Sequence, residues 1–278
     1  VDRVRGLLRV PLAMLQTCRL LYQYRPEVVL GVGGYASGPA LLMAWLCRYP
    51  TAIQEQNAHA GITNRILGRL VRRIYLGFEA ANRQFKGKRT LATGNPIRAA
   101  LVNALMTSQA SRETSNAEAP LRILVFGGSQ GARFLNEEVP GLLHGLKEAH
   151  PQLDIRVTHQ TGLHDVELTR ERYSGGVLAD QVEVLPYIDD MPSAYANADI
   201  AISRAGALTV AELTAVGLPC LLVPFPFAAD NHQEANAKVL VDAGAALMMT
   251  QADWSPTDAI AWLAELGENK ARLERMSH

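Results

Sequence analysis

Short apolar runs alternate with longer segments of helical periodicity along almost the whole chain. Runs such as 121–126 (LRILVF) have the length and the aliphatic content of buried strands, whereas segments such as 208–216 are helical in pattern. The pattern predicts strands at 27–31, 51–53, 73–77, 121–126, 154–159, 182–185, 199–203, 218–223 and 244–250. It predicts helices at 1–24, 40–47, 62–70, 134–146, 163–173, 189–197, 208–216 and 256–266, with a further helix that carries Gln233.

Strands that alternate with helices imply parallel sheets joined by right-handed crossovers. The stretch 106–120 interrupts this alternation, because it is polar and almost free of large apolar residues, as a linker or exposed loop is. Two α/β runs on either side of it predict two doubly wound domains, 1–98 and 99–278. Such domains bind ligands at the carboxyl ends of their strands, so we expect the active site in the cleft between them.

Glycine-rich turns follow several of the predicted strands, at 31–39, 127–133 and 204–207. A strand, a glycine loop and a helix in succession let backbone N–H groups approach a phosphate closely. The region 204–237 adds two helix N-termini, so a bound nucleotide is the first hypothesis. Tight turns also need glycine, and the loop at 31–39 alone therefore leaves phosphate binding and a structural turn equally open. The polar run 54–57 leaves ligand contact and a capped turn equally open.

The composition indicates no specific function, but it argues against several classes of protein. Lys and Arg together number 27, as do Asp and Glu, so the net charge gives no indication of a nucleic-acid partner. The three cysteines are scattered and have neither disulfide nor metal-ligand spacing, which fits a reducing cytoplasm. No apolar run approaches the roughly 20 residues that a membrane span needs, and no signal peptide is apparent.

The first predicted helix has a basic character, with Arg3, Arg5, Arg9 and Arg19 among its leucines. It is either a surface helix with a solvated face or a helix that lies against anionic lipid. The sequence begins with Val1 inside this helix rather than with Met, so we expect it to be an incomplete protein.

Five motifs then occur in a fixed order: 33–39 (GGYASGP), 55–57 (EQN), 94–98 (GNPIR), 127–133 (GGSQGAR) and 204–212 (RAGALTVAE). Together they resemble the MurG family of peptidoglycan N-acetylglucosaminyltransferases over essentially the whole chain. The resemblance implies a GT-B fold, with two Rossmann-like doubly wound parallel-sheet domains facing across a cleft and the first domain incomplete. It also implies an inverting transfer of GlcNAc from UDP-GlcNAc to lipid I, which forms lipid II at the anionic cytoplasmic face of the bacterial inner membrane.

The resemblance assigns the donor site mainly to the second domain. Ser129 would contact the donor phosphate, the backbone of Ile188 the uracil, and Glu212 both ribose hydroxyls. The remaining donor contacts that it implies are Asn57, His232 and Gln233 on the sugar, Arg98, and a segment around the diphosphate and sugar that comprises Gly206, Ala207, Leu208, Thr209, Val210 and Ala211.

The resemblance places the acceptor's diphosphate on the first glycine loop, at Gly33, Gly34, Tyr35, Ser37 and Gly38. No acidic pair with metal-binding spacing stands out, so a mechanism without metal or cofactor is the simpler hypothesis. The helix N-termini would then stabilise the negative charge that develops on the leaving UDP.

The chain also departs from the family pattern. The family begins with another glycine loop, whose histidine is the candidate general base, and the sequence has no such segment. Glu55 is a weak substitute, for which a structural hydrogen-bonding role is favoured. Gln54 stands where the family usually has histidine, and glutamine cannot titrate. The final helix is also expected to be cut short, so the chain could be inactive alone.

Three alternatives remain open at this point. A UDP-GlcNAc 2-epimerase would have a similar donor site, but it would need neither the first glycine loop nor a basic amphipathic helix. A non-catalytic UDP-sugar-binding fragment of a split transferase would bind the donor without turnover. A dinucleotide enzyme is disfavoured, because the loops lack a full Gly-x-Gly-x-x-Gly motif with an acidic residue roughly 20 positions later.

Overall fold

The computed structural model describes residues 2–85, 89–103, 119–175 and 178–277, without the side chains of 2–10 and 35. Close packing divides the chain into two units: Val1–Pro96 together with Ala229–Asn236, and Ile97–Ala228 together with Ala237–His278. The sequence places the division after residue 98 and assigns 229–236 to the second domain, and that domain assignment stays a prediction.

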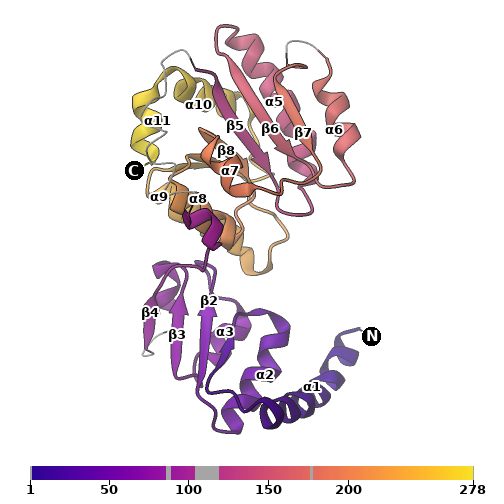
Figure 1. The fold of residues 1–278 in the computed structure, drawn as a ribbon, viewed down its shortest axis with the longest axis vertical. Helices are drawn as coiled ribbons and strands as arrows, with labels where there is room; N and C mark the ends of the chain where they lie inside the picture. Colours follow the sequence, from indigo (N-terminus) through magenta and orange to yellow (C-terminus); the bar gives the residue numbers. More distant parts are fainter. Residues whose placement is uncertain (1, 86–88, 104–118, 176–177, 278) are drawn as a thin grey trace. The chain divides into compact units, whose positions relative to one another are not determined.

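The first unit is built around a four-stranded parallel sheet of order β1-β2-β3-β4 (Figure 1). Its elements are α1 (Asp2–Tyr24), β1 (Val29–Gly31), α2 (Gly34–Leu46), β2 (Thr51–Glu55), α3 (Ile62–Leu67), β3 (Arg73–Leu76), the 3₁₀ helix η1 (Glu79–Gln84) and β4 (Thr90–Ala92). Every residue of β2 is buried, as expected of an inner strand, whereas Leu30 on the edge strand β1 is exposed. The carboxyl end of β2, which carries Glu55, is therefore held firmly within this sheet.

The second unit contains a six-stranded parallel sheet of order β10-β9-β8-β5-β6-β7. Its strands are β5 (Leu121–Phe126), β6 (Ile155–Gln160), β7 (Val182–Leu185), β8 (Ile200–Ser203), β9 (Cys220–Leu222) and β10 (Ala246–Met248). Its helices are α5 (Arg133–Ala149), α6 (Val166–Tyr173), α7 (Met191–Ala196), α8 (Ala207–Val216), α10 (Pro256–Glu268) and α11 (Lys270–Ser277). The 3₁₀ helix η2 (Ala229–Asn231) and the start of α9 (His232–Asp242) pack with the first unit, and the rest of α9 with the second.

This strand order is that of a dinucleotide-binding α/β fold, in which the chain reverses direction across the sheet between its first and fourth strands. Here the reversal falls between β5 and β8, which pair in parallel so that Phe126 lies opposite Ser203. The loops that leave these two strands therefore emerge side by side, where open α/β sheets bind ligands.

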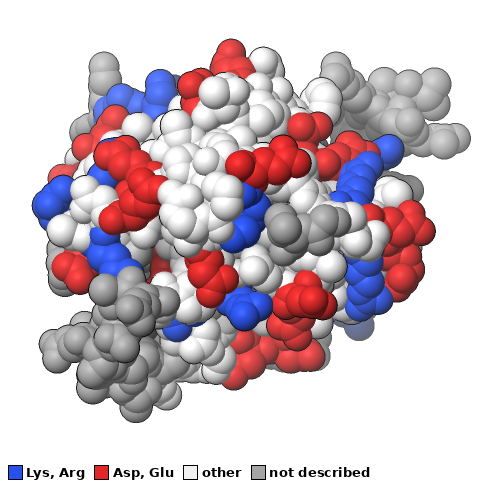
Figure 2. All heavy atoms as spheres, turned by 90° about the horizontal axis from the view of Figure 1, so that it is seen from above, with Lys and Arg blue, Asp and Glu red and all other residues white. Residues whose placement is uncertain are grey.

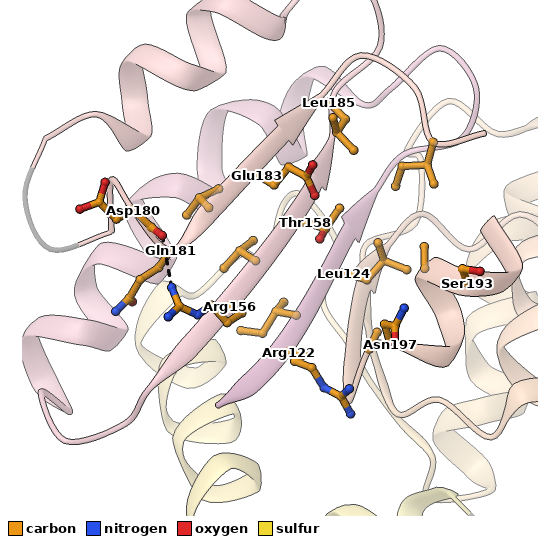
Figure 3. Close-up of a pocket in the computed structure, with 16 residues that line it drawn as sticks. Arg122, Leu124, Arg156, Thr158, Asp180, Gln181, Glu183, Leu185, Ser193 and Asn197 are labelled. Atoms are coloured by element: carbon orange, nitrogen blue, oxygen red, sulfur yellow. Dashed lines mark hydrogen bonds between the residues drawn. The ribbon is translucent and has the colours of Figure 1, made fainter. Parts of the chain in front are cut away.

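The main core of the second unit lies on one face of its sheet. Helices α5, α6 and α10 supply aliphatic side chains such as Leu142, Val166 and Leu263 to this core, while α7 borders the opposite face (Figures 1 and 3). Burial of these side chains removes apolar surface from water, which is the main force that holds the layers together.

Local sequence signals fix several helix ends in the second unit. Asp190 caps α7 by accepting a hydrogen bond from the Ser193 amide at 3.1 Å. Gly217 ends α8 with φ +60°, a conformation that glycine adopts without strain, and the prediction that it stops this helix is confirmed. Ser255 caps α10 in the same way as Asp190 caps α7, by accepting from the amide of Asp258.

Acidic and basic side chains are intermingled over the face drawn in Figure 2. Within the described ranges, no helix combines the length and the apolar character that crossing a membrane requires. The basic side chains predicted at Arg3, Arg5 and Arg9 lie outside the described side chains, although the backbone of this segment belongs to α1.

Candidate functional site

The loop after β5 has a conformation that depends on its glycines. Gly128 and Gly131 have φ of +93° and +73°, and the amide of Gly131 donates to the Gly128 carbonyl at 2.9 Å. A Cβ on Gly131 would lie 1.8 Å from the carbonyl oxygen of Thr161, so no other residue fits there without movement. Ser129, predicted to contact phosphate, is exposed at the tip of this loop. The loop therefore presents backbone and a hydroxyl to solvent at the reversal point of the sheet.

A network of buried, hydrogen-bonded polar side chains packs next to this loop. Asn136 on α5 donates to the Thr161 carbonyl and to Asp165, both at 2.9 Å. His159 is 3.1 Å from the Asn136 side-chain oxygen through Nε2 and 3.0 Å from the Tyr173 hydroxyl through Nδ1. Burial lowers the pKa of His159 to about 3 and raises that of Tyr173, so the imidazole is neutral and the phenol protonated at pH 7. These residues were not predicted from the sequence, although a polar side chain such as Asn136 on the apolar face of a helix is a signal.

The loop after β8 leads into α8, whose first turn carries most of the predicted diphosphate segment. Gly206 is the N-cap and has no side chain with which to cap the helix. The predicted positions that follow it, Ala207, Leu208, Thr209, Val210 and Ala211, lie in the first turns of α8. The N-terminus of a helix attracts negative charge through its dipole and its amide groups. This arrangement agrees with a segment that could bind phosphate.

Glu212 follows Ala211 in the second turn of α8 and is contacted from two sides. Its Oε1 accepts from the Arg98 guanidinium, with both Nε and Nη2 at 3.3 Å, and its Oε2 accepts from the Tyr195 hydroxyl at 3.0 Å. The Glu212 side chain is 13% exposed and that of Arg98 is 51% exposed. The structure thus brings into contact two residues that were each predicted to bind the donor. Arg98 packs with the second unit, whereas the sequence assigns it to the first domain.

Tyr195 was not singled out from the sequence. It lies on α7, is 1% exposed, and its ring packs edge-on against Phe126 with centroids 5.7 Å apart. Burial raises the pKa of Tyr195, and the Glu212 carboxylate raises it further, so the hydroxyl keeps its proton and donates it. A tyrosine at helical spacing ordinarily indicates core, and here its contact with Glu212 connects it with the site.

A hollow of about 540 Å³ opens on the face of the sheet beside α7 (Figure 3). Its base is formed by strand residues such as Leu124, Thr158 and Leu185, and Arg122 lies at the amino end of the strands. Ile188, predicted to contact uracil through its backbone, lines this hollow just beyond the carboxyl end of β7 and has a buried side chain. The hollow therefore reaches the same edge of the sheet as the glycine loops.

In the first unit, both carboxylate oxygens of Glu55 accept hydrogen bonds. It is 1% exposed and accepts from the amides of Asn57 and Gly61 and from the side chains of Asn57 and Asn64. Asn236 holds the same segment, donating to Asn57 Oδ1 at 3.1 Å and accepting from the Ala58 amide at 2.8 Å. Asn57 is thus fixed by neighbours on both sides, which suits a side chain predicted to meet a sugar.

The other two predicted sugar contacts lie in the segment that packs with the first unit. His232 and Gln233 begin α9, just after a turn in which Asp230 and Asn231 have φ of +50° and +54°. The Nδ1 atom of His232 is 2.6 Å from the Ala229 carbonyl, which acts as a hydrogen-bond acceptor and so fixes the proton on that nitrogen. Packing therefore groups these residues in one unit with Asn57, although they are far from it in sequence.

The first glycine loop is shorter than the sequence predicts. Gly33 and Gly34 have φ of +91° and +75°, and this sharp turn lets α2 begin at Gly34 instead of residue 40. Ser37 and Gly38 consequently lie in the first turns of α2, where Ser37 donates to the Gly33 carbonyl. Tyr35, also predicted for the acceptor, has a side chain outside the described ones. Among the residues described, no cluster of three or more His, Cys, Asp or Glu could hold a metal ion.

Two family models match the chain. The glycosyltransferase family 28 C-terminal domain matches residues 122–278, and the N-terminal domain of the same family matches residues 1–76. The C-terminal model covers more than half of the chain by itself. The N-terminal model matches the part of the sequence that forms most of the first unit, and the C-terminal model the part that forms most of the second.

Individual relatives agree with the family models. An enzyme from Anaeromyxobacter sp. (strain K), named UDP-N-acetylglucosamine–N-acetylmuramyl-(pentapeptide) pyrophosphoryl-undecaprenol N-acetylglucosamine transferase, is 46% identical over 98% of this chain and 68% of its own length. The crystal structure of Acinetobacter baumannii MurG superposes with a TM-score of 0.77 at 36% identity, over 97% of this chain and 74% of that one.

A UDP-GlcNAc 2-epimerase from Neisseria meningitidis superposes with a TM-score of 0.66 at 15% identity, over 97% of this chain and 75% of its own. This likeness reflects the fold alone. The two parallel-sheet α/β domains and the match to MurG confirm the GT-B fold that the sequence predicts. With both family 28 domains and a relative at 46% identity, the chain belongs to the MurG family of glycosyltransferase family 28.

Proposed function

We propose that the chain transfers GlcNAc from UDP-GlcNAc to lipid I, forming lipid II with inversion at the anomeric carbon. The names of the relatives support this reaction, since they specify an N-acetylglucosamine transferase acting on pyrophosphoryl-undecaprenol. The observation that supports donor binding is the convergence of two loops at the reversal point between β5 and β8, with Glu212 in the second turn of the helix that follows β8. That arrangement is typical of a nucleotide site.

In the proposed donor complex, Ser129 and the first turn of α8 from Gly206 to Ala211 bind the diphosphate. The backbone of Ile188 contacts the uracil, and Glu212 accepts hydrogen bonds from the ribose hydroxyls. Arg98, which contacts Glu212, would exchange that partner for a donor phosphate. Negative charge that develops on UDP as the glycosidic bond breaks would be stabilised by the α8 dipole and by Arg98, without metal or cofactor.

Asn57, His232 and Gln233 would bind the hydroxyls of the transferred sugar. The hydrogen bonds that fix Asn57 support this role, because a group held in place before binding loses little conformational freedom when the sugar arrives. The acceptor's diphosphate would contact the first glycine loop, from Gly33 and Gly34 through Tyr35 to Ser37 and Gly38. Two glycines at positive φ followed directly by a helix support that assignment.

No residue of the chain is proposed as the general base. Glu55 accepts hydrogen bonds from four donors, so taking a proton would break contacts that shape the 57–64 segment. We therefore assign it a structural role, which the sequence analysis favoured.

The chain would act at the cytoplasmic face of the inner membrane, where its lipid-linked acceptor resides. Exposed leucines on α1 support this location, with Leu12 and Leu15 57% and 67% exposed. Replacing both by glutamate should reduce co-sedimentation with vesicles that contain anionic lipid. Leu168→Glu, at an exposed leucine of α6 in the other unit, is the matched control. Equal sedimentation of the double variant and the control would contradict the membrane role.

The decisive experiment uses UDP-GlcNAc that carries radiolabel in the sugar, with and without lipid I in vesicles. The transferase function predicts label in the lipid fraction that depends on lipid I and is lost in Glu212→Ala. Release of UDP-ManNAc without any lipid product would instead identify an epimerase, the second candidate favoured by the shared fold. Tight donor binding without turnover would identify a non-catalytic UDP-sugar-binding fragment.

A further inference from the structure

Glu212 can recognise a ribose only if its carboxylate is correctly oriented. A glutamate has three rotatable side-chain bonds, so fixing the direction of the Glu212 carboxylate, whose side chain is 13% exposed, has an entropic cost. Here the two oxygens have different partners: Arg98, which is half exposed, on Oε1, and the buried Tyr195 on Oε2. Oε1, which contacts the half-exposed Arg98, is therefore the more accessible oxygen, and Oε2 contacts the buried tyrosine.

Tyr195 is well placed to be the fixed partner of the two. Its ring packs against Phe126, the last residue of β5 before the glycine loop that carries Ser129. It belongs to α7, which Asp190 caps. A buried phenol needs a hydrogen-bond partner, and here the Glu212 carboxylate accepts its proton at 3.0 Å. The tyrosine therefore links the position of Glu212 to the strand that leads into the proposed phosphate loop.

We propose that Tyr195 is a positioning residue of the donor site: its hydroxyl holds Glu212 Oε2, so that Oε1 is presented to the ribose when Arg98 turns towards the diphosphate. The inference depends on the proposed function, because it needs Glu212 to bind ribose. It goes further in assigning specificity for a ribonucleotide to a buried residue that does not itself touch the ligand. Tyr195 then contributes to discrimination at the ribose rather than to phosphate binding.

The test compares Tyr195→Phe with Tyr173→Phe by calorimetry. Both tyrosines are almost fully buried in the second unit, and the Tyr173 hydroxyl contacts His159 instead of Glu212. The ligands are UDP and 2′,3′-dideoxyuridine diphosphate, which lacks the hydroxyls that Glu212 would bind. Phenylalanine keeps the ring that packs on Phe126, and thermal unfolding checks that each variant is folded.

We expect Tyr195→Phe to weaken UDP binding about tenfold, as loss of a hydrogen bond to a charged group allows, and to leave binding of the dideoxy ligand within about twofold. Tyr173→Phe should leave the ratio of the two affinities unchanged. In a Glu212→Ala background, Tyr195→Phe should have no further effect on UDP binding, because the group that it orients is gone.

Three results would overturn the inference: an equal loss for both ligands, no loss for either, or effects of Tyr195→Phe and Glu212→Ala that simply add. Each of these leaves the proposed function intact as long as the unmodified chain binds UDP-GlcNAc and transfers its sugar. If the unmodified chain binds neither UDP nor UDP-GlcNAc, the proposed function itself is wrong, and the role of Tyr195 at the ribose is wrong with it.

Discussion

Arg98 and Glu212 form an ion pair within the second unit, with Nε 3.3 Å from Oε1, although 114 positions separate them in the sequence. Both were predicted to bind the donor. Because of this contact, Arg98 would have to leave Glu212 in order to bind a phosphate of the donor, as proposed. Because Arg98 is half exposed, an ion pair of this kind contributes only about 0–1 kcal/mol to stability, and the exchange costs little.

Replacing Arg98 by alanine should therefore weaken UDP-GlcNAc binding by about tenfold and leave thermal stability nearly unchanged. The remaining affinity should depend less steeply on salt, since a charged contact has been removed. Calorimetry over a range of salt concentrations measures both effects. Arg170→Ala is the matched control, because Arg170 is also half exposed and pairs with Glu167 at 2.7 Å. Unchanged or tighter donor binding by Arg98→Ala would show that Arg98 serves only to neutralise Glu212.

Asn236→Ala should lower both stability and sugar recognition. The change removes the hydrogen bonds to the Ala58 amide and to Asn57, at a site that is fully buried. Leaving such groups without partners costs about 1–3 kcal/mol, measurable by urea unfolding. Because the Asn57 side chain loses one of the two partners that fix it, affinity for UDP-GlcNAc should fall more than affinity for UDP. Asn82→Ala, at an exposed asparagine of the same unit with a hydrogen bond to Thr90, should change neither.

Gly131→Ala and Gly141→Ala should have opposite effects. A methyl group at Gly131 would meet the Thr161 carbonyl at 1.8 Å and would also force alanine to φ +73°, so we expect a loss of about 2–4 kcal/mol together with weaker UDP binding. A methyl group at Gly141, inside α5, meets nothing within 4 Å and should stabilise the helix by about 0.5–1 kcal/mol. A Gly131→Ala chain with unaltered stability and affinity would contradict the described loop geometry.

The buried His159 should make the protein sensitive to mild acid. Its pKa is about 3 in the folded chain, below its ordinary value near 6.5, because burial penalises the charged form. The unfolded chain then binds more protons between those two values, so the free energy of unfolding falls as the pH decreases from about 6.5 towards 3. His159→Gln should flatten this dependence between pH 7 and 5, whereas the control His164→Gln, at an exposed histidine, should not. Equal slopes for the two variants would be the contrary result.

Much of the fold follows from local pattern. The strands Leu121–Phe126 and Val182–Leu185 have the bounds that the sequence predicts, and Gly217 ends α8 as expected. These elements are governed by short-range effects, namely apolar runs and turn residues, which single sequences display directly. The strand Thr90–Ala92 was missed, because its three residues carry a weak pattern and owe their conformation to pairing with β3.

The sequence by itself determined the alternating α/β architecture, the positions of the glycine loops and, through its motifs, the residues proposed for the donor. Only the tertiary structure decided that Glu212 is contacted by Arg98 and Tyr195, and that Glu55 is occupied by four hydrogen bonds. The physical reason is distance along the chain. Periodicity and turn chemistry act over a few residues, whereas the partners of a buried carboxylate come from whichever elements the sheet order brings beside it.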